Sequence, residues 1–264
     1  MLAEPLKRSQ STIFFSATLV PIDYFKQLLT GSADHPALAF RSPFPLENVQ
    51  LMVHNGISTK YKERDSSYAP IASAIETTCN AQAGNYLVFF PSYAYMDAVL
   101  EFVKERLPEE QLLIQSRGMT EPERESFLAQ FSTDNSETMI GFAVMGGIFG
   151  EGIDLVGERL IGTIVIGVGL PQMGLERDLI KEYFDEQNVN GFSYAYQYPG
   201  FNRVLQATGR GIRTGTDRGI IVLIDERFAH ARYRRLFPAH WQGFQIIQSE
   251  DEIKDHLERF WLQS

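Results

Sequence analysis

Four residues late in the chain have types and a spacing that suit contact with a phosphate. Gln206, Gly209, Arg210 and Arg213 form the pattern Q-x-x-G-R-x-x-R. If this stretch is a helix, Gln206, Arg210 and Arg213 lie at i, i+4 and i+7 and share one face. Arginine carries a permanently charged, planar fork of donors, so a face with two guanidiniums and an amide can hold a phosphate. A solvated polar face is the alternative interpretation, because most surface helices have one.

Three further stretches place small or polar residues directly after an apolar run that predicts a strand. They are Ser16–Thr18 after residues 12–15, Ser92 and Tyr93 after residues 85–90, and Gly146–Asp154 after residues 138–144. Serine at a helix start can leave backbone amides for a phosphate, tyrosine can stack on a base, and glycines let a ligand approach the backbone. Hydroxyl turns, helix caps and ordinary packing are the structural alternatives.

Two familiar nucleotide motifs are excluded by the same residues. The loop GGIFGEG lacks the order G-x-G-x-x-G and does not lead into a long helix, which argues against a dinucleotide site. Residues 220–226 imitate a magnesium-binding Walker B strand, but the chain has no Walker A motif and no Gly-Lys pair. We therefore interpret Asp225 and Arg227 as an internal ion pair or a support on the phosphate side, and we expect no metal site.

Apolar runs that alternate with amphipathic stretches must position these residues. Strands are expected at residues 12–15, 49–53, 85–90, 111–115, 138–144, 160–167, 220–224 and 244–248. Helices are expected at 21–30, 68–80, 92–107, 120–131, 172–186, across the Q-x-x-G-R-x-x-R stretch, and at 229–236 and 250–261. This alternation predicts an α/β domain with a mostly parallel sheet covered by helices on both faces. Ligands of such sheets bind at the carboxyl ends of the strands, and we expect all the stretches above to lie there.

Composition narrows the possible functions. With 44% hydrophobic and 22% charged residues, the 264-residue chain is an ordinary globular protein. One cysteine excludes an internal disulfide and a multi-cysteine cluster within this chain, and five scattered histidines argue against zinc. The formal net charge of −9 means that any contact with nucleic acid must be local. We expect no membrane span and no signal peptide, and the abrupt entry into a strand suggests a cut within a longer protein.

The motifs, taken in order, resemble those of a known family. SATL, FFPSY, GGIFGEGID followed by RLIGTIVIGVGLP, and QATGRGIR followed by DRGIIVLIDERF look like motifs III, IV, V and VI of XPD/DinG-type superfamily 2 DNA helicases. The resemblance runs from about Thr12 to Phe237. It implies a second RecA-like lobe, of the P-loop NTPase fold but without its own Walker A. It also implies that residues 49–264 form this lobe, while 1–48 carry motif III and a linker from a first lobe that the chain lacks.

The resemblance also implies roles for named residues. In this family a two-lobed motor uses ATP to move along single-stranded DNA, usually 5′ to 3′. Gln206, Arg210 and Arg213 would reach the ATP phosphates, with Arg210 or Arg213 as arginine finger. Asp154, Glu151 and Gly152 would meet the nucleotide and couple it to DNA, Ser92, Tyr93, Gly146 and Gly147 would contact DNA, and Ser16 and Thr18 would link hydrolysis to lobe movement.

Cofactors and partners follow from the same resemblance. ATP and Mg²⁺ would be bound mainly by the first lobe of the same polypeptide, and an iron–sulfur cluster is possible in the full-length protein but not in this chain. The full-length protein is expected to be a cytoplasmic, bacterial ATP-dependent DNA helicase that associates with the nucleoid, and the fragment alone is expected to be inactive. The alternatives are a non-catalytic module that binds nucleic acid or protein, and an RNA motor of the same superfamily.

Overall fold

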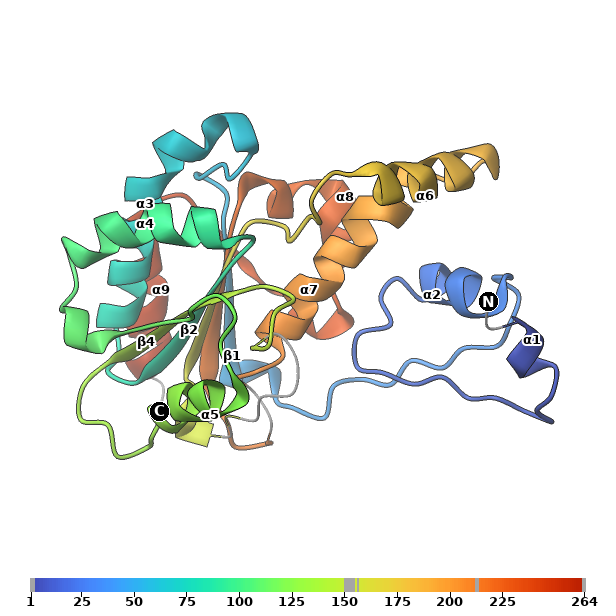
Figure 1. Ribbon diagram of the computed structural model, residues 1–264. Coiled ribbons are helices and arrows are strands. Elements are labelled where there is room, and N and C mark those ends of the chain that lie inside the picture. Colours follow the sequence, from blue (N-terminus) through green and yellow to red (C-terminus); the bar gives the residue numbers. More distant parts are fainter. Residues whose placement is uncertain (1–2, 150–154, 156, 212–213, 263–264) are drawn as a thin grey trace. The chain divides into compact units, whose positions relative to one another are not determined.

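The computed structural model describes residues 3–149, 155, 157–211 and 214–262 (Figure 1). The strands are β1 (Val49–His54), β2 (Asn85–Phe90), β3 (Leu112–Ile114), β4 (Met139–Val144), β5 (Gly162–Ile166), β6 (Gly219–Ile224) and β7 (Gln245–Ile247). The α-helices are α1 (Ala3–Leu6), α2 (Ile22–Thr30), α3 (Arg64–Asn80), α4 (Tyr93–Lys104), α5 (Glu121–Ala129), α6 (Leu175–Glu186), α7 (Tyr198–Thr208), α8 (Ala231–Arg234) and α9 (Glu250–Leu262). Among the residues described, no helix is both long and apolar enough to cross a membrane.

The chain divides into two compact units. Unit 1 comprises residues 1–41 and 170–202, and unit 2 comprises residues 42–169 and 203–264. The sequence interpretation did not anticipate that residues 170–202 would group with the N-terminal segment. The assignment of residues 1–48 to a preceding lobe stays a prediction.

Unit 2 is built on one seven-stranded sheet in the order β3-β4-β2-β5-β6-β1-β7. Every neighbouring pair in this sheet is parallel. All residues of β2, β5 and β6 are buried, which is why these strands are continuous apolar runs without polar alternation. The prediction of a parallel α/β sheet is therefore confirmed.

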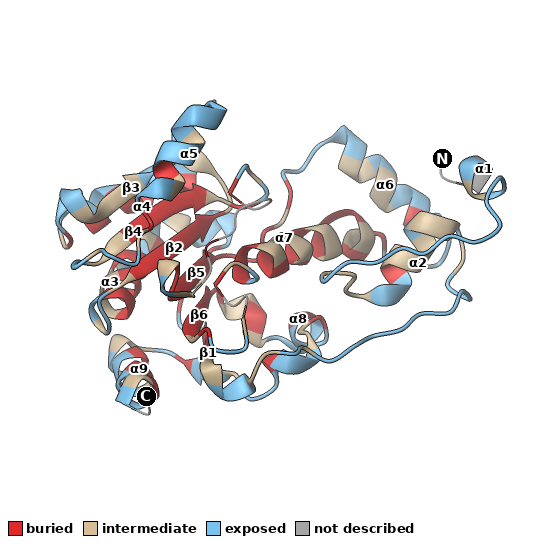
Figure 2. Cartoon of the chain, turned by 90° about the horizontal axis from the view of Figure 1, so that it is seen from below, coloured by how far each residue is buried: buried red, intermediate tan, exposed pale blue. Residues whose placement is uncertain are grey.

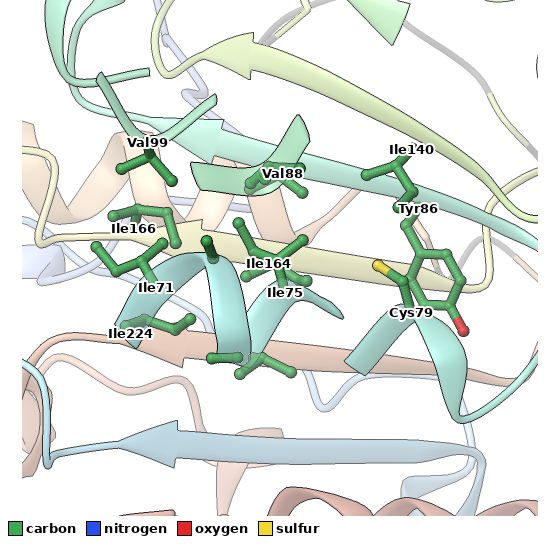
Figure 3. Packing of buried hydrophobic residues seen from close by; sticks show 14 of the residues in the cluster. Ile71, Ile75, Cys79, Tyr86, Val88, Val99, Ile140, Ile164, Ile166 and Ile224 are labelled. Carbon is green, nitrogen blue, oxygen red and sulfur yellow. The ribbon is translucent and has the colours of Figure 1, made fainter. Parts of the chain in front are cut away.

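Helices cover both faces of this sheet. On one face, α3, α4 and α9 enclose the main core, in which Ile75 of α3 lies beside Ile164 of β5 and Ile71 lies beside Ile166 (Figure 3). On the other face α5 packs against β4. Gly141 of β4 leaves room for this contact, since a Cβ added there would lie 3.2 Å from the ring of Phe127 in α5 and 2.6 Å from the ring of Phe131, which follows α5. The part of α7 that belongs to unit 2 also lies on this second face (Figure 1). Two covered faces leave the ends of the strands as the places where loops can carry function.

Unit 1 is held together by aromatic packing. The Tyr24 ring of α2 lies 5.2 Å from Tyr194 and 5.1 Å from Tyr198, and Phe184 of α6 lies 4.2 Å from Tyr194. Helix α2 ends at Gly31, which adopts the left-handed conformation with φ 78°, as the sequence predicts. Many of its other residues are exposed, as the pale blue N-terminal segment in Figure 2 shows.

One predicted strand, residues 12–15, is wrong. These residues have no regular structure, and the side chains of Ile13 and Phe15 are 84% and 90% exposed. An apolar run becomes a strand only when it finds a ladder partner, and the described residues of unit 1 contain no strand that could pair with it. Ser16 and Thr18 therefore do not follow the end of a sheet strand.

His54, the last residue of β1, gives unit 2 a predictable response to acid. Its side chain is 2% exposed, and both ring nitrogens lack a hydrogen-bond partner among the described residues. Burial lowers the pKa of His54, although Glu250 and Glu252 oppose this shift. The folded state thus keeps the ring neutral at pH values where the unfolded chain, with a pKa of about 6.5, binds a proton.

We expect the free energy of unfolding to fall as the pH drops below about 6.5, by at most about 1.4 kcal/mol per pH unit for this one proton. The stabilising contribution is present above the unfolded pKa and is lost toward the lowered folded pKa. Urea unfolding of the wild type and of His54→Leu between pH 5 and 7.5 would measure the difference. Parallel pH profiles for the two proteins would contradict this assignment.

Candidate functional site

The carboxyl end of β2 leads directly into the N-terminus of α4. Ser92 is the N-cap of this helix, and its Oγ accepts a hydrogen bond from the Tyr95 backbone N–H at 3.3 Å. The cap fixes the direction of α4, so its first amides lie at the carboxyl edge of the sheet. Because a helix N-terminus attracts negative charge, this position suits a phosphate.

A buried glutamine ties the carboxyl end of β2 to that of β4. Gln115, which is 4% exposed, donates from Nε2 to the Tyr93 hydroxyl at 2.8 Å and accepts at Oε1 from the Val144 backbone N–H at 2.9 Å. The exposed guanidinium of Arg117 lies 5.2 Å from the centre of the Tyr93 ring. Tyr93 is therefore held in place from behind, with a cation beside its ring.

The sequence interpretation missed both Gln115 and Arg117. A signal was available, because Gln115 directly follows the apolar run that forms β3, and Arg117 lies two residues further on. They obey the same strand-end rule that drew attention to Ser92.

The backbone conformation and the close contacts after β4 require glycine at these positions. Gly146 is exposed and has a φ of 71°, a conformation that favours glycine. A Cβ at this position would also lie 3.0 Å from Nε of Arg203. The Gly147 backbone N–H donates to the Val144 carbonyl at 3.2 Å, which closes a tight turn. Gly146 and Gly147 thus bring backbone and the Arg203 side chain together at the carboxyl edge, near Gln115.

The prediction that one helix carries Gln206 and Arg210 is wrong, and Arg213 lies outside the described residues. Helix α7 ends at Thr208, whose Oγ1 donates to the carbonyls of Val204 and Leu205 at 3.1 Å each. Arg210 lies in the turn that follows, and its Nε donates to the Gln206 carbonyl at 3.0 Å. The physical reason is the glycine content, because Gly209 and Gly211 weaken a helix that already ends in a threonine.

Gly211 shows where this turn lies on the sheet. It is buried, and a Cβ added to it would lie 3.6 Å from the Leu160 carbonyl oxygen and 3.8 Å from Oγ1 of Thr163. Leu160 precedes β5 and Thr163 is its second residue, so Arg210 and Gly211 lie at the amino end of β5. The expectation that all candidate stretches gather at the carboxyl edge is therefore wrong for Arg210, whereas Gln206 lies within α7, one turn after Arg203. Ser92, Tyr93, Gly146 and Gly147 do gather there.

Comparison with known proteins identifies the chain. The family model for the helicase C-terminal domain matches residues 75–244. The chain belongs to this family. It is 26% identical over 243 residues to a probable ATP-dependent helicase of Methanocaldococcus jannaschii, covering 88% of the chain and 35% of that protein. It is 27% identical over 255 residues to an ATP-dependent DNA helicase of Caenorhabditis elegans, covering 89% of the chain and 30% of that protein.

Solved structures agree on the fold of this helicase domain. It is similar to a structure of an XPD helicase, with a TM-score of 0.66, 21% identity, and coverage of 89% of this chain and 42% of that one. The chain is also similar to a structure of Xpd4 from S. tokodaii, with a TM-score of 0.64 and 15% identity. The match covers 92% of this chain and 46% of that one. The chain is thus a RecA-like C-terminal domain of the XPD/DinG type. It spans about a third or less of the curated relatives above.

Several predicted site residues of the helicase domain cannot be placed. Glu151, Gly152, Asp154 and Arg213 lie outside the described residues, so their assigned contacts with nucleotide stay predictions. The buried residues that flank the glycine loop are described. Phe149 packs at 4.4 Å from the Phe127 ring of α5, and Leu155 is 1% exposed.

Ser16 and Thr18 form a hydroxyl turn in unit 1 of the helicase chain. The Thr18 backbone N–H donates to Oγ of Ser16 at 3.2 Å, and the two hydroxyl oxygens are 3.3 Å apart. This matches the structural alternative of an ST turn. Their role in coupling hydrolysis to lobe movement stays a prediction.

Asp225, at the carboxyl end of β6, is confirmed as half of an internal ion pair. Arg227 Nε donates to Oδ1 at 2.7 Å and its Nη2 donates to Oδ2 at 2.9 Å, while the Thr59 hydroxyl also donates to Oδ2. The Asp225 carboxylate is fully buried, and both of its oxygens are occupied. Burial lowers the pKa of Arg227, but the hydrogen bonds to Asp225 and the nearby negative charges of Asp225 and Glu226 together raise it above its usual range. Within the described ranges no group of three acidic, histidine or cysteine residues could hold a metal ion.

Proposed function

We propose that this domain is the second motor lobe of an ATP-driven helicase that moves along single-stranded DNA. The observation that carries the proposal is the separation of its candidate residues. Tyr93 and the Gly146–Gly147 turn lie at the carboxyl edge of the sheet, and Arg210 lies at the amino end of β5. One rigid sheet thus offers separate positions for two ligands, which a motor must bind at the same time.

The amino edge would serve the nucleotide. This chain has no Walker A motif, so ATP and Mg²⁺ would be held by another lobe of the same polypeptide. Arg210 and Arg213 would place positive charge against the transferring phosphoryl group, with Gln206 beside them. Asp154, Glu151 and Gly152 would meet the nucleotide from the loop after β4. The isolated chain would then not hydrolyse ATP.

The carboxyl edge would serve DNA. The start of α4 at Ser92 suits a backbone phosphate, Tyr93 offers a fixed ring for a base, and Gly146 leaves the backbone of the turn exposed. Arg203 lies beside this edge in a chain whose net charge is −9, and so does Arg117, whose guanidinium is exposed and 3.8 Å from the exposed Asp97 carboxylate. The proposed motor would run 5′ to 3′ in a bacterial cytoplasm, meet DNA at the nucleoid, and carry any iron–sulfur cluster in a part outside this chain.

The test uses the complete helicase, which joins this domain to its ATP-binding lobe. We expect oligothymidylate to stimulate ATP hydrolysis more than the matching oligouridylate does. Tyr93→Ala should raise the DNA concentration for half-maximal stimulation about 5- to 150-fold, because stacking on one base contributes about 1–3 kcal/mol. The basal rate without DNA should not change.

Tyr93→Phe is the matched control, because it keeps the ring and removes only the hydroxyl that Gln115 contacts. It should retain most of the DNA response. A wild-type helicase whose ATPase responds equally to RNA would point to an RNA motor, and one with no ATPase at all would favour a non-catalytic module. Either result would overturn the proposal.

A further inference from the structure

A pocket of about 390 Å³ lies in the connection between β6 and β7. Its walls include Arg234, Arg235, Phe237, Trp241 and Phe244, and we call it the Arg–Trp pocket. In the sheet order β6, β1 and β7 form one end, whereas the candidate DNA residues follow β2 and β4. The pocket is therefore separate from the site proposed above.

The pocket is built from one short segment that is tied to itself. The Phe237 backbone N–H donates to the Arg234 carbonyl at 3.1 Å, and the Trp241 N–H donates to the Pro238 carbonyl at 2.9 Å. The Phe237 ring packs edge-on at 5.1 Å against both Trp241 and Phe244. Trp241 is only 4% exposed, whereas Phe237 and Phe244 are half-buried, so the three rings form the apolar part of the lining. Such a preformed cup loses little conformational entropy on binding.

The rim of the pocket is positively charged. Arg234 and Arg235 are exposed, and neither forms an ion pair within the part of the chain that the structure describes. Residues 230–244 include three arginines and no acidic residue, in a chain of net charge −9. A local basic patch beside an apolar cup selects for a ligand that is apolar at its centre and anionic at its edge.

We infer that the Arg–Trp pocket binds a short acidic peptide segment of a partner protein, with one large apolar side chain in the cup and carboxylates on Arg234 and Arg235. Adjacent guanidiniums suit carboxylates, which they can hold through paired hydrogen bonds. Single-stranded nucleic acid fits less well, because its bases need open ring faces and its phosphates need a row of cations. Here the largest ring is buried, the rings pack against one another, and the two rim cations adjoin.

The test is titration of the isotope-labelled chain with an amidated peptide in which a tryptophan is flanked on both sides by glutamate and aspartate. We expect saturable amide shifts in residues 231–244 at millimolar peptide or below. A peptide with lysines in place of the acidic residues, and one with glycine in place of the tryptophan, should each bind at least about tenfold more weakly.

Variants of the chain separate the pocket from general electrostatics. Arg234→Glu/Arg235→Glu should weaken binding by about tenfold or more, whereas Lys254→Glu/Arg259→Glu, which makes the same charge change on the exposed face of α9, should not. Thermal unfolding of both variants verifies the fold. The inference is overturned if the acidic peptide gives no saturable shift, if both double variants weaken binding equally, or if oligothymidylate shifts residues 231–244 at lower concentration than the peptide.

Discussion

Arg210→Ala in the complete helicase is expected to lower the rate of ATP turnover about a thousandfold or more, while binding of single-stranded DNA stays within a few-fold of the wild type. An arginine finger contributes about 10³–10⁵ to the rate of phosphoryl transfer, because its charge is positioned where negative charge develops. We expect the same result for Arg213→Ala. Steady-state ATPase assays and fluorescence anisotropy with a labelled oligothymidylate would measure the two quantities.

The geometry explains why DNA binding should be spared. Arg210 lies at the amino end of β5, and its Nε contacts the Gln206 carbonyl. The candidate DNA residues lie at the opposite edge of the sheet, after β2 and β4. Arg259→Ala is the matched control, because Arg259 is an exposed arginine of α9 that lies 4.0 Å from Asp255. It should leave the rate of ATP turnover and the affinity for DNA unchanged. If Arg210→Ala and Arg213→Ala both turn over ATP at the wild-type rate, the arginine-finger assignment is wrong.

The second large effect is expected from the buried ion pair after β6. Asp225→Ala should lower the free energy of unfolding by about 3–5 kcal/mol, because it leaves the guanidinium of Arg227 without its counter-ion in a largely buried place. The Thr59 hydroxyl and backbone N–H would lose their acceptor as well. Urea unfolding, with the transition midpoint and slope recorded separately, would measure the loss.

Two further variants test whether the unpaired charge of Arg227 causes that loss of stability. Asp225→Ala/Arg227→Met should lose less than Asp225→Ala alone, because no unpaired charge remains and methionine fills part of the space. Asp255→Ala removes an exposed pairing with Arg259 and should cost no more than about 1 kcal/mol. An Asp225→Ala protein as stable as the wild type would show that the pair contributes nothing to folding.

The sheet could be predicted from the sequence because strands that are buried on both faces are continuous runs of apolar residues. Residues 85–90 were predicted as a strand and form β2 with the same bounds, since every one of them is apolar or buried. The start of α5 was equally clear, because Thr120 and Glu123 form the predicted capping box. Such signals are local, so no knowledge of the rest of the fold is needed to read them.

What failed were the features that depend on distant partners. Residues 12–15 are as apolar as a strand, but nothing pairs with them in the structure. The end of α7 at Thr208 was missed for a different reason, because the common face expected for Gln206 and Arg210 favoured a longer helix although Gly209 and Gly211 weaken one locally. Gln115 was missed because its importance lies in joining Tyr93 to Val144, and those residues are brought together only by the order of the strands.

The separation of the two edges also sets a length scale for the proposed motor. The five residues of β5 span about 16 Å at the usual rise of a parallel strand. A lobe that pivots at its amino edge therefore acts as a lever arm of that length. A rotation of about 12° would displace the carboxyl edge by about 3.4 Å, which equals the axial rise per nucleotide of one strand in duplex DNA. In the proposed motor, a stiff sheet of this depth would convert a small angular change at the nucleotide into a displacement of a few ångströms at the DNA edge.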